Sequence, residues 1–295
     1  KLKHLAVLGK LPKLKSLTIN GQWPAWVDFQ PSDLEYIENT TMSGSCSGVR
    51  AFGSEDSFFP SLEKLKLRDL SNLKGWWSGD NNSDQEDGRL LPAFPRLSHL
   101  TIRDCPSLAS MPLCPTVEDL KISYCNVNLR IMESIKSGNS KLRTVSTDNM
   151  AHLRAALPIE AFQGLNSMSI KWDWELEKLS EFEVVFRCCS SSLQQLCIFD
   201  CPLLKSVTGG LEHLTALESL VLNCMPSLSE AGEGVEDDGT PWRCLHSLRS
   251  LKFRYMQNMV KLPNGMRYLT TLEDLRIEST ELESLPEWMP ELTSL

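Results

Sequence analysis

The sequence lacks several features by which protein functions are often recognised. It has no run approaching the ~20 apolar residues that span a membrane, and no signal peptide opens it. It contains no Gly-rich phosphate loop, no His-Glu-x-x-His zinc motif and no Gly-x-Ser-x-Gly nucleophile turn. Its five His are scattered, and none lies at metal-ligand spacing from a cysteine pair. We therefore expect no enzyme, no metal, no cofactor and no membrane partner.

Positive charge is also scarce, with 30 Lys and Arg against 38 Asp and Glu and a formal net charge of −8. Because nucleic-acid binding needs a basic footprint, we expect no nucleic-acid partner. The ten cysteines do not form the paired framework of a small secreted protein. We interpret them as reduced thiols of a cytoplasmic protein, with the nucleus as a second compartment. The chain begins without Met and ends inside a repeat, so we expect an excised fragment.

One pattern recurs along the whole chain. Residues 97–108 read Leu-x-x-Leu-x-Leu-x-x-Cys-Pro-x-Leu, and the three leading anchors fit nine other segments. Successive copies begin mostly 20 to 31 residues apart. This spacing is typical of leucine-rich repeats, whose units are about 20–29 residues long. The first anchors of the copies are Leu14, Leu62, Leu97, Val117, Leu142, Leu165, Leu193, Leu217, Leu248 and Leu272.

The repeats predict an α/β fold, a leucine-rich-repeat solenoid or horseshoe with a parallel β-sheet on its concave side. In each copy three apolar anchors alternate with polar residues, as in a half-buried strand. Prolines after the strands, such as Pro112, Pro263 and Pro286, favour mostly irregular convex returns, because a proline inside a helix costs ~3 kcal/mol. Segments 134–138 and 175–186 are the expected helical exceptions.

We predict a single leucine-rich-repeat domain over residues 1–295, with about ten repeats and truncated at both ends. Three stretches interrupt the pattern and are predicted as loop insertions, near 31–57, 78–89 and 229–241. The second stretch does not fit an EF-hand calcium loop. Counted from Asp80, its sixth and twelfth residues are not the required Gly and Glu. We interpret it, like the third, as a solvated acidic loop.

The side chains between the anchors should face the concave surface. At the fifth and seventh repeat positions eight residues are basic and two, Asp148 and Glu278, are acidic, a balance opposite in sign to that of the whole chain. Exposed aromatic residues and Arg dominate binding hot spots. The alternative is that strand faces collect Lys and Arg to prevent aggregation. The candidate protein-binding residues are Lys66, Arg68, Arg103, Lys121, Tyr124, Lys171, Trp172, Phe199, Lys252, Arg254, Tyr255 and Arg276.

Five phrases of the sequence resemble one protein family. They are residues 8–17, 59–67, 104–112, 200–207 and 282–289, among them Asp-Cys-Pro-Ser-Leu-Ala-Ser-Met-Pro and Leu-Glu-Ser-Leu-Pro-Glu-Trp-Met. They resemble the C-terminal repeats of plant intracellular immune receptors, the coiled-coil, nucleotide-binding, leucine-rich-repeat class of disease-resistance proteins. The resemblance covers nearly the whole chain. Its Cys-Pro-x-Leu element and irregular repeat length are more specific than the leucine pattern.

The resemblance implies a protein-recognition and autoinhibitory module that senses a pathogen or pest effector, or a guarded host protein, through the concave face. The nucleotide-binding and coiled-coil domains of the same receptor would be its other partners. Two alternatives from other classes stay open. One is the substrate-recognition repeat domain of a ubiquitin ligase, which requires an F-box-like segment upstream. The other is a cell-surface receptor ectodomain, which the lack of paired Cys-rich caps disfavours.

Overall fold

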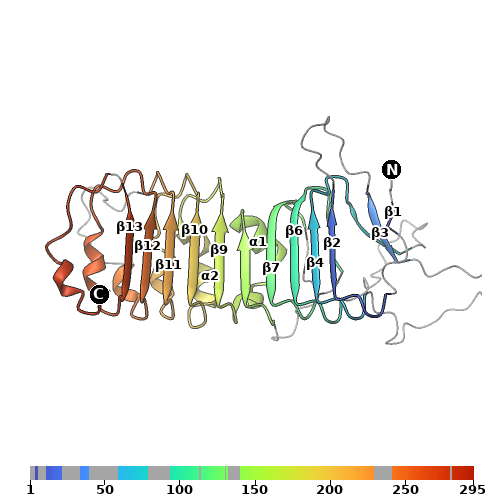
Figure 1. The fold of residues 1–295 in the computed structure, drawn as a ribbon, viewed down its shortest axis with the longest axis horizontal. Helices are drawn as coiled ribbons and strands as arrows, with labels where there is room; N and C mark the ends of the chain where they lie inside the picture. The colour runs from blue at the N-terminus through green and yellow to red at the C-terminus, as the bar shows by residue number, and fades with distance from the viewer. Residues whose placement is uncertain are drawn as a thin grey trace, which may run out of the picture. The chain divides into compact units, whose positions relative to one another are not determined.

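The chain divides into two compact units in a computed structural model. Unit 1 comprises Lys1–Leu142 and Ala155–Pro158, and unit 2 comprises Arg143–Arg154 and Ile159–Leu295. In each unit the repeats contribute parallel strands that lie side by side (Figure 1). The structure describes residues 4–5, 11–21, 34–39, 59–78, 94–112, 114–129, 131, 140–228, 241–279 and 281–295.

Unit 1 contains two parallel sheets. The larger has the strand order β7-β6-β4-β2, and the smaller has the order β1-β3-β5. Repeat anchors pair in register across the larger sheet, since Leu65 lies opposite Leu100 and Leu100 lies opposite Leu120. Equivalent repeat positions therefore form straight rows. The strands are β1 His4–Leu5, β2 Ser16–Asn20, β3 Tyr36–Asn39, β4 Lys64–Arg68, β5 Gly75–Ser78, β6 His99–Cys105 and β7 Asp119–Cys125.

Strand β3 lies inside segment 31–57, which we predicted as an irregular loop, and at Tyr36–Asn39 that prediction is wrong. The strand pairs with β1 on one side and β5 on the other. Ile37 is buried and anchors it, but four residues are too few to show a period in the sequence. Residues 31–33 and 40–57, together with 79–89 and 229–240, lie outside the described residues, so the loop predictions stay predictions there.

Unit 2 contains six parallel strands in the order β13-β12-β11-β10-β9-β8. Their burial alternates as predicted: Leu196 and Ile198 are fully buried, whereas Cys197 between them is partly exposed. Parallel pairing and alternating anchors confirm the predicted leucine-rich-repeat fold. The strands are β8 Thr144–Thr147, β9 Ser167–Lys171, β10 Gln195–Phe199, β11 Ser219–Asn223, β12 Ser250–Arg254 and β13 Asp274–Glu278.

The returns between the strands of unit 2 are mostly short 3₁₀ turns and irregular chain, as the prolines predicted. Helix α2, Glu183–Cys188, follows the turn η3, Leu179–Phe182, so the second half of the predicted helical segment 175–186 is helical. The predicted helix at 134–138 lies outside the described residues. None of the described helices has the length and hydropathy to cross a bilayer. The remaining turns are η2 Ile159–Phe162, η4 Leu211–His213, η5 Trp242–Cys244, η6 Asn264–Tyr268 and η7 Met289–Glu291.

Helix α1, Met150–Ala156, was not predicted, and a buried carboxylate fixes its first turn. Asp173 is 2% exposed, and its Oδ2 accepts the backbone N–H of Met150 at 2.9 Å. Its Oδ1 accepts the N–H groups of Glu175 at 3.1 Å and Leu176 at 3.0 Å. A negative charge at a helix N-terminus satisfies free N–H groups and interacts favourably with the helix dipole. Asp173 thereby joins two successive repeats.

A hydroxyl group just before the first anchor makes a second contact between neighbouring repeats. Ser192 Oγ donates to the carbonyl of Leu165 at 2.9 Å. Thr271 Oγ1 donates to the carbonyl of Leu248, also at 2.9 Å. Each acceptor belongs to the first anchor of the preceding repeat. Because a buried carbonyl without a partner is costly, these hydroxyls help to hold successive repeats together.

Replacing Asp173 by alanine should lower the free energy of unfolding by about 2–4 kcal/mol, because three backbone N–H groups lose a charged acceptor. Urea denaturation followed by circular dichroism measures the loss. The control is Asp274→Ala, which removes a carboxylate whose side chain is 57% exposed and should lower the free energy of unfolding clearly less. Equal losses in the two variants would contradict the role given to Asp173.

Candidate functional site

We call the solvent-exposed side of each unit's repeat sheet its strand face; this is the face that we predicted to be concave. It is formed by the first, third and fifth residues of the strands. In unit 1 the in-register pairing places these side chains in three rows. The rows are Ser16, Lys64, His99 and Asp119; Thr18, Lys66, Thr101 and Lys121; and Asn20, Arg68, Arg103 and Ser123.

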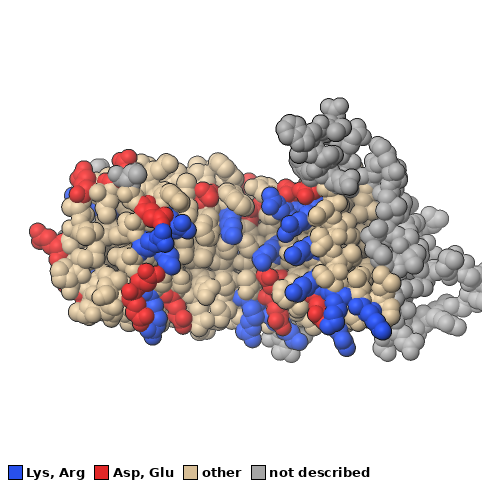
Figure 2. Space-filling model, in the orientation of Figure 1, with Lys and Arg blue, Asp and Glu red and all other residues tan. Residues whose placement is uncertain are grey.

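Strand β4 presents three cations that have no ion pair within the part of the chain that the structure describes. Lys64, Lys66 and Arg68 alternate with the buried Leu65 and Leu67, so all three are exposed. Alternate residues of a strand stand ~6.6 Å apart, a distance at which neighbouring unit charges in water repel each other by about 0.6 kcal/mol. Figure 2 shows Lys and Arg gathered over β4, β6 and β7. The local charge of this face is therefore positive.

The other two cations of unit 1's strand face have acidic partners. Arg103 Nε lies 2.9 Å from Asp104 Oδ2, and Lys121 Nζ lies 3.3 Å from Asp119 Oδ2. Asp119 belongs to the first row of the face. The charge count in the sequence covered only the second and third rows, which are the fifth and seventh repeat positions, and therefore omitted it. Exposed pairs of this kind contribute only ~0.2–1 kcal/mol, so a partner can replace either carboxylate at little cost.

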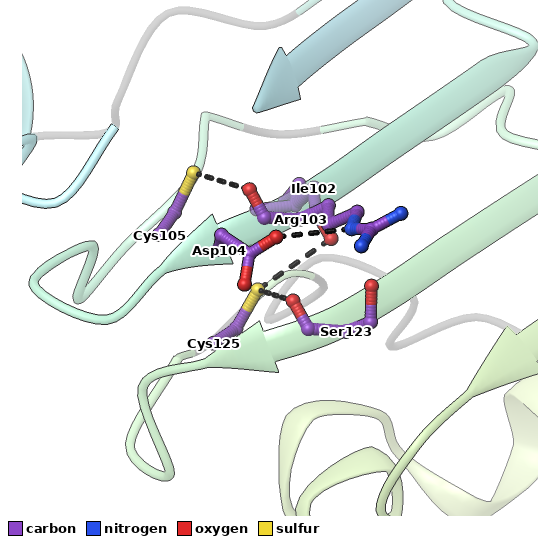
Figure 3. A network of polar contacts seen from close by, with 6 residues as sticks. All are labelled: Ile102, Arg103, Asp104, Cys105, Ser123 and Cys125. Carbon is purple, nitrogen blue, oxygen red and sulfur yellow. Dashed lines mark hydrogen bonds and ion pairs between the residues drawn. The ribbon is translucent and has the colours of Figure 1, made fainter. Parts of the chain in front are cut away.

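Two cysteines build the corner next to Arg103 (Figure 3). The thiol of Cys105 donates to the carbonyl of Arg103 at 3.3 Å, and that of Cys125 donates to the carbonyl of Ser123 at 3.2 Å. Burial raises the pKa of the Cys105 thiol to about 11, so at neutral pH it keeps the proton that it donates. Asp104, with a φ of 52°, completes the turn in the left-handed conformation that Asp tolerates.

Unit 2's strand face also carries cations. The three cations of β12 and β13 form ion pairs with two carboxylates on β13. Lys252 Nζ lies 3.3 Å from Asp274 Oδ2. Glu278 accepts from Arg254 Nε at 3.2 Å and from Arg276 Nε at 2.6 Å. These guanidinium groups, Arg254 above all, hold the pKa of Glu278 below its usual range. Lys and Arg accordingly adjoin Asp and Glu over β12 and β13 in Figure 2.

Between these ion pairs and β9, unit 2's strand face is uncharged, and Figure 2 shows mostly uncharged residues over β10. Its outward residues on β10 and β11 are Gln195, Cys197, Phe199, Ser219, Val221 and Asn223. The ammonium group of Lys171 lies 5.3 Å from the ring centroid of Phe199, a cation–π distance. Val221 stands next to them on β11 and is partly exposed. Trp172 and Trp174 follow β9 and are 42% and 64% exposed. The sequence prediction missed Trp174, because it lies outside the strand alternation.

Three of the candidate aromatic residues have a strained backbone. Tyr124, Trp172 and Tyr255 have φ values of 50°, 60° and 52°. Each directly follows the fifth strand residue, where other repeats carry Asp69 or Asp200 in the same conformation. The left-handed region costs a bulky residue ~1–2 kcal/mol, and 46%, 42% and 60% exposure leaves little burial to offset that cost. These three aromatic residues therefore stay candidates for a binding role.

The structure places nine of the predicted site residues on the strand faces, Trp172 and Tyr255 directly after a strand, and Tyr124 at the sixth residue of β7. Five of them lie in unit 1, and the other seven lie in unit 2. The predicted residues have different surroundings in the two units: Lys66 and Arg68 have no ion pair with a described residue, whereas the cations of β12 and β13 do. Lys64 was missed, although the Lys-Leu-Lys-Leu-Arg alternation of β4 could have revealed it. Within the described ranges no group of His, Cys, Asp and Glu could hold a metal ion.

Comparison with models of known protein families and with curated proteins gave no match. The solved structures that are similar include the following two. One is TLR13 in its complex with ssRNA13, with a TM-score of 0.40, 13% identity, and 93% of this chain and 42% of that chain covered. The other is the leucine-rich-repeat protein LIC12759 of Leptospira interrogans, with a TM-score of 0.36, 14% identity, and 100% and 86% covered. The chain thus spans less than half of the TLR13 chain. Because the TM-scores and identities are this low, the assignment of the fold rests on the repeats and on the register of their strands instead.

Replacing Tyr255 by Asn should raise the free energy of unfolding by up to about 1 kcal/mol, because Asn tolerates the left-handed backbone better. The converse variant, Asp200→Tyr, places an aromatic ring at the equivalent repeat position and should lower it. Thermal denaturation of both variants measures the difference. Shifts of the melting temperature in the same direction would contradict the assignment of strain to this repeat position.

The buried thiols should be unreactive in the folded chain. Burial raises the pKa of Cys105 to about 11 and that of Cys114, Cys189 and Cys201 to about 12, whereas the thiolate is the reactive form. We expect no labelling of these four by a disulfide reagent at pH 8, read residue by residue by mass spectrometry. All ten cysteines should react in guanidinium without a reductant. A smaller number would contradict the reduced state and favour an extracellular protein.

Proposed function

We propose that this chain is the protein-recognition module of a plant intracellular immune receptor of the coiled-coil, nucleotide-binding, leucine-rich-repeat class, and that it is not an enzyme. The observation that carries the proposal is the strand face of each unit. Lys64, Lys66 and Arg68 repel one another there, and Trp172 and Tyr255 keep a strained backbone while exposed. The repeat fold requires neither the like charges on β4 nor aromatic side chains at the left-handed position, where other repeats carry Asp. Recognition of a protein surface uses both kinds of side chain.

A strand face with its side chains in rows is well suited to recognising a protein. The side chains stand on a rigid sheet, so little conformational entropy is lost when they bind. Aromatic residues and Arg provide most of the energy at protein interfaces, and unit 2 exposes both around β9 and β12. The ion pairs of β12 and β13 would form part of a polar rim around such a centre.

The partners in this proposal are a pathogen or pest effector, or a guarded host protein, together with the nucleotide-binding and coiled-coil domains of the same receptor. The five sequence phrases that resemble this receptor class support it, and so do thiols kept protonated by burial, which suit the reducing cytoplasm. In this arrangement the chain restrains the nucleotide-binding domain until the effector or host protein is engaged.

The full-length transcript that contains this chain tests the proposal. We expect a Gly-x-x-x-x-Gly-Lys-Ser/Thr phosphate loop encoded upstream of Lys1, because the switch of such a receptor is its nucleotide-binding domain. The purified full-length protein should then bind ATP, and this chain alone should not. An F-box-like segment upstream would instead identify the repeat domain of a ubiquitin ligase, and a signal peptide would identify a cell-surface ectodomain. Either result would overturn the proposal.

A further inference from the structure

The exposed cations of unit 1's strand face form a continuous group, which we call the cationic strip. Its centre is β4, where Lys64, Lys66 and Arg68 have no ion pair with a described residue. Arg68 lies opposite Arg103 in the next strand, so the strip widens at that end. Lys121 lies one strand further on, beyond Thr101. The strip therefore consists of Lys64, Lys66, Arg68, Arg103 and Lys121.

Protection against aggregation does not account for the cationic strip. Lysines serve that purpose on edge strands, whose free N–H and C=O groups could pair with another chain. Strand β4 is not an edge, because it pairs with β2 along one side and with β6 along the other. The neighbouring strand β2 presents only Ser16, Thr18 and Asn20 to the same face. Three like charges thus stand in the interior of a sheet, where they repel one another.

The spacing of these charges indicates the geometry of an anionic partner. Alternate residues of β4 repeat every ~6.6 Å along the strand, and alternate residues of any extended peptide repeat at the same distance. An extended segment that runs along β4 can therefore place one carboxylate against each of the three cations. The acidic residues of a helical partner would follow the curved surface of the helix instead. Only the first two of them could then match the spacing of the cations on β4.

The composition of the three rows favours a peptide over a nucleic acid. Single-stranded nucleic acids are held by aromatic side chains on which their bases stack. The three rows of unit 1 contain no Phe, Trp or Tyr. They contain instead small hydrogen-bonding side chains next to the cations, such as Thr18, Asn20 and Thr101, which suit the polar groups of a peptide.

We propose that the cationic strip binds an extended acidic segment of a protein partner, with Asp or Glu at every second residue. The proposal rests on the proposed function and names the chemistry of the segment that unit 1 recognises. Arg68 and Arg103 stand side by side, so one carboxylate of the segment can accept hydrogen bonds from both guanidinium groups. Arg103 then exchanges its exposed partner Asp104 for the segment.

Fluorescence anisotropy with the full chain at low salt tests this proposal. The probe is a labelled peptide in which three Glu alternate with Thr. The comparison peptide has the same composition with its three Glu contiguous, so that only two of them share a face of the extended chain. We expect the alternating peptide to bind about tenfold more tightly, because only it can pair with Lys64, Lys66 and Arg68 together. Added salt should weaken its binding.

Charge reversal of β4 provides the decisive variant. The triple substitution Lys64→Glu, Lys66→Glu and Arg68→Glu should abolish binding of the Thr-Glu peptide and create binding of an alternating Thr-Lys peptide. Gain of the second peptide shows that the variant is folded. The matched control is Lys205→Gln with Arg249→Gln in unit 2, whose charges are paired with Glu177 and Glu273 and which are not among the candidate binding residues. It should leave the affinity for the Thr-Glu peptide unchanged.

Four results would overturn the proposal: no binding of either acidic peptide, equal binding of both, no loss in the β4 variant, or tighter binding of a single-stranded oligonucleotide of the same charge. This assay does not depend on any upstream domain. Its failure would leave the receptor proposal standing, and the absence of a phosphate loop upstream would leave peptide binding standing.

Discussion

In-register pairing of parallel strands governs both the core and the surface of each unit. Across β4, β6 and β7 the pairing aligns Leu65, Leu100 and Leu120, which are all buried. The same pairing aligns the outward residues between them, so charges from different repeats stand next to one another. A slip of one residue would turn the buried set outward, and it would therefore destroy core and binding face together. The stability of the fold thus maintains the geometry of the surface.

The two strand faces differ because of what the pairing brings side by side. On β12 and β13, cations and carboxylates of adjacent strands meet, as Lys252 does with Asp274 and Arg254 with Glu278. On β4, neither neighbouring strand supplies a carboxylate to the three exposed cations. The position after the fifth strand residue adds a feature that both units share, since Tyr124, Trp172 and Tyr255 have there a backbone conformation that suits Asp. In both units, therefore, some exposed residues make the fold less stable than other residue types would at the same positions.

The sequence was sufficient for the strands of the repeat sheets, but not for β3, because only an alternation that recurs in ten copies identifies a residue such as Leu100 or Leu196 as a core anchor. It was not sufficient for the charge balance. The pairing of Lys252 with Asp274 depends on which strands are neighbours, and the row that contains Asp274 was not counted. Helix α1 depends on Asp173, which lies 23 residues after the N–H that it accepts. Such contacts between repeats leave no local pattern in the chain.

We expect a positive electrostatic potential at unit 1's strand face and a potential close to zero at that of unit 2 around β11 and β12. The most direct measurement places a cysteine at Thr101, between Lys66 and Lys121, or at Val221, next to Lys252. The introduced cysteine reacts with an anionic and with a cationic methanethiosulfonate, and the ratio of the two rates reports the local electrostatic potential. The pKa of the thiol does not affect this ratio, because both reagents react with the same thiolate. At low salt the ratio should be several times higher for Thr101→Cys than for Val221→Cys. Equal ratios at the two positions would contradict the account.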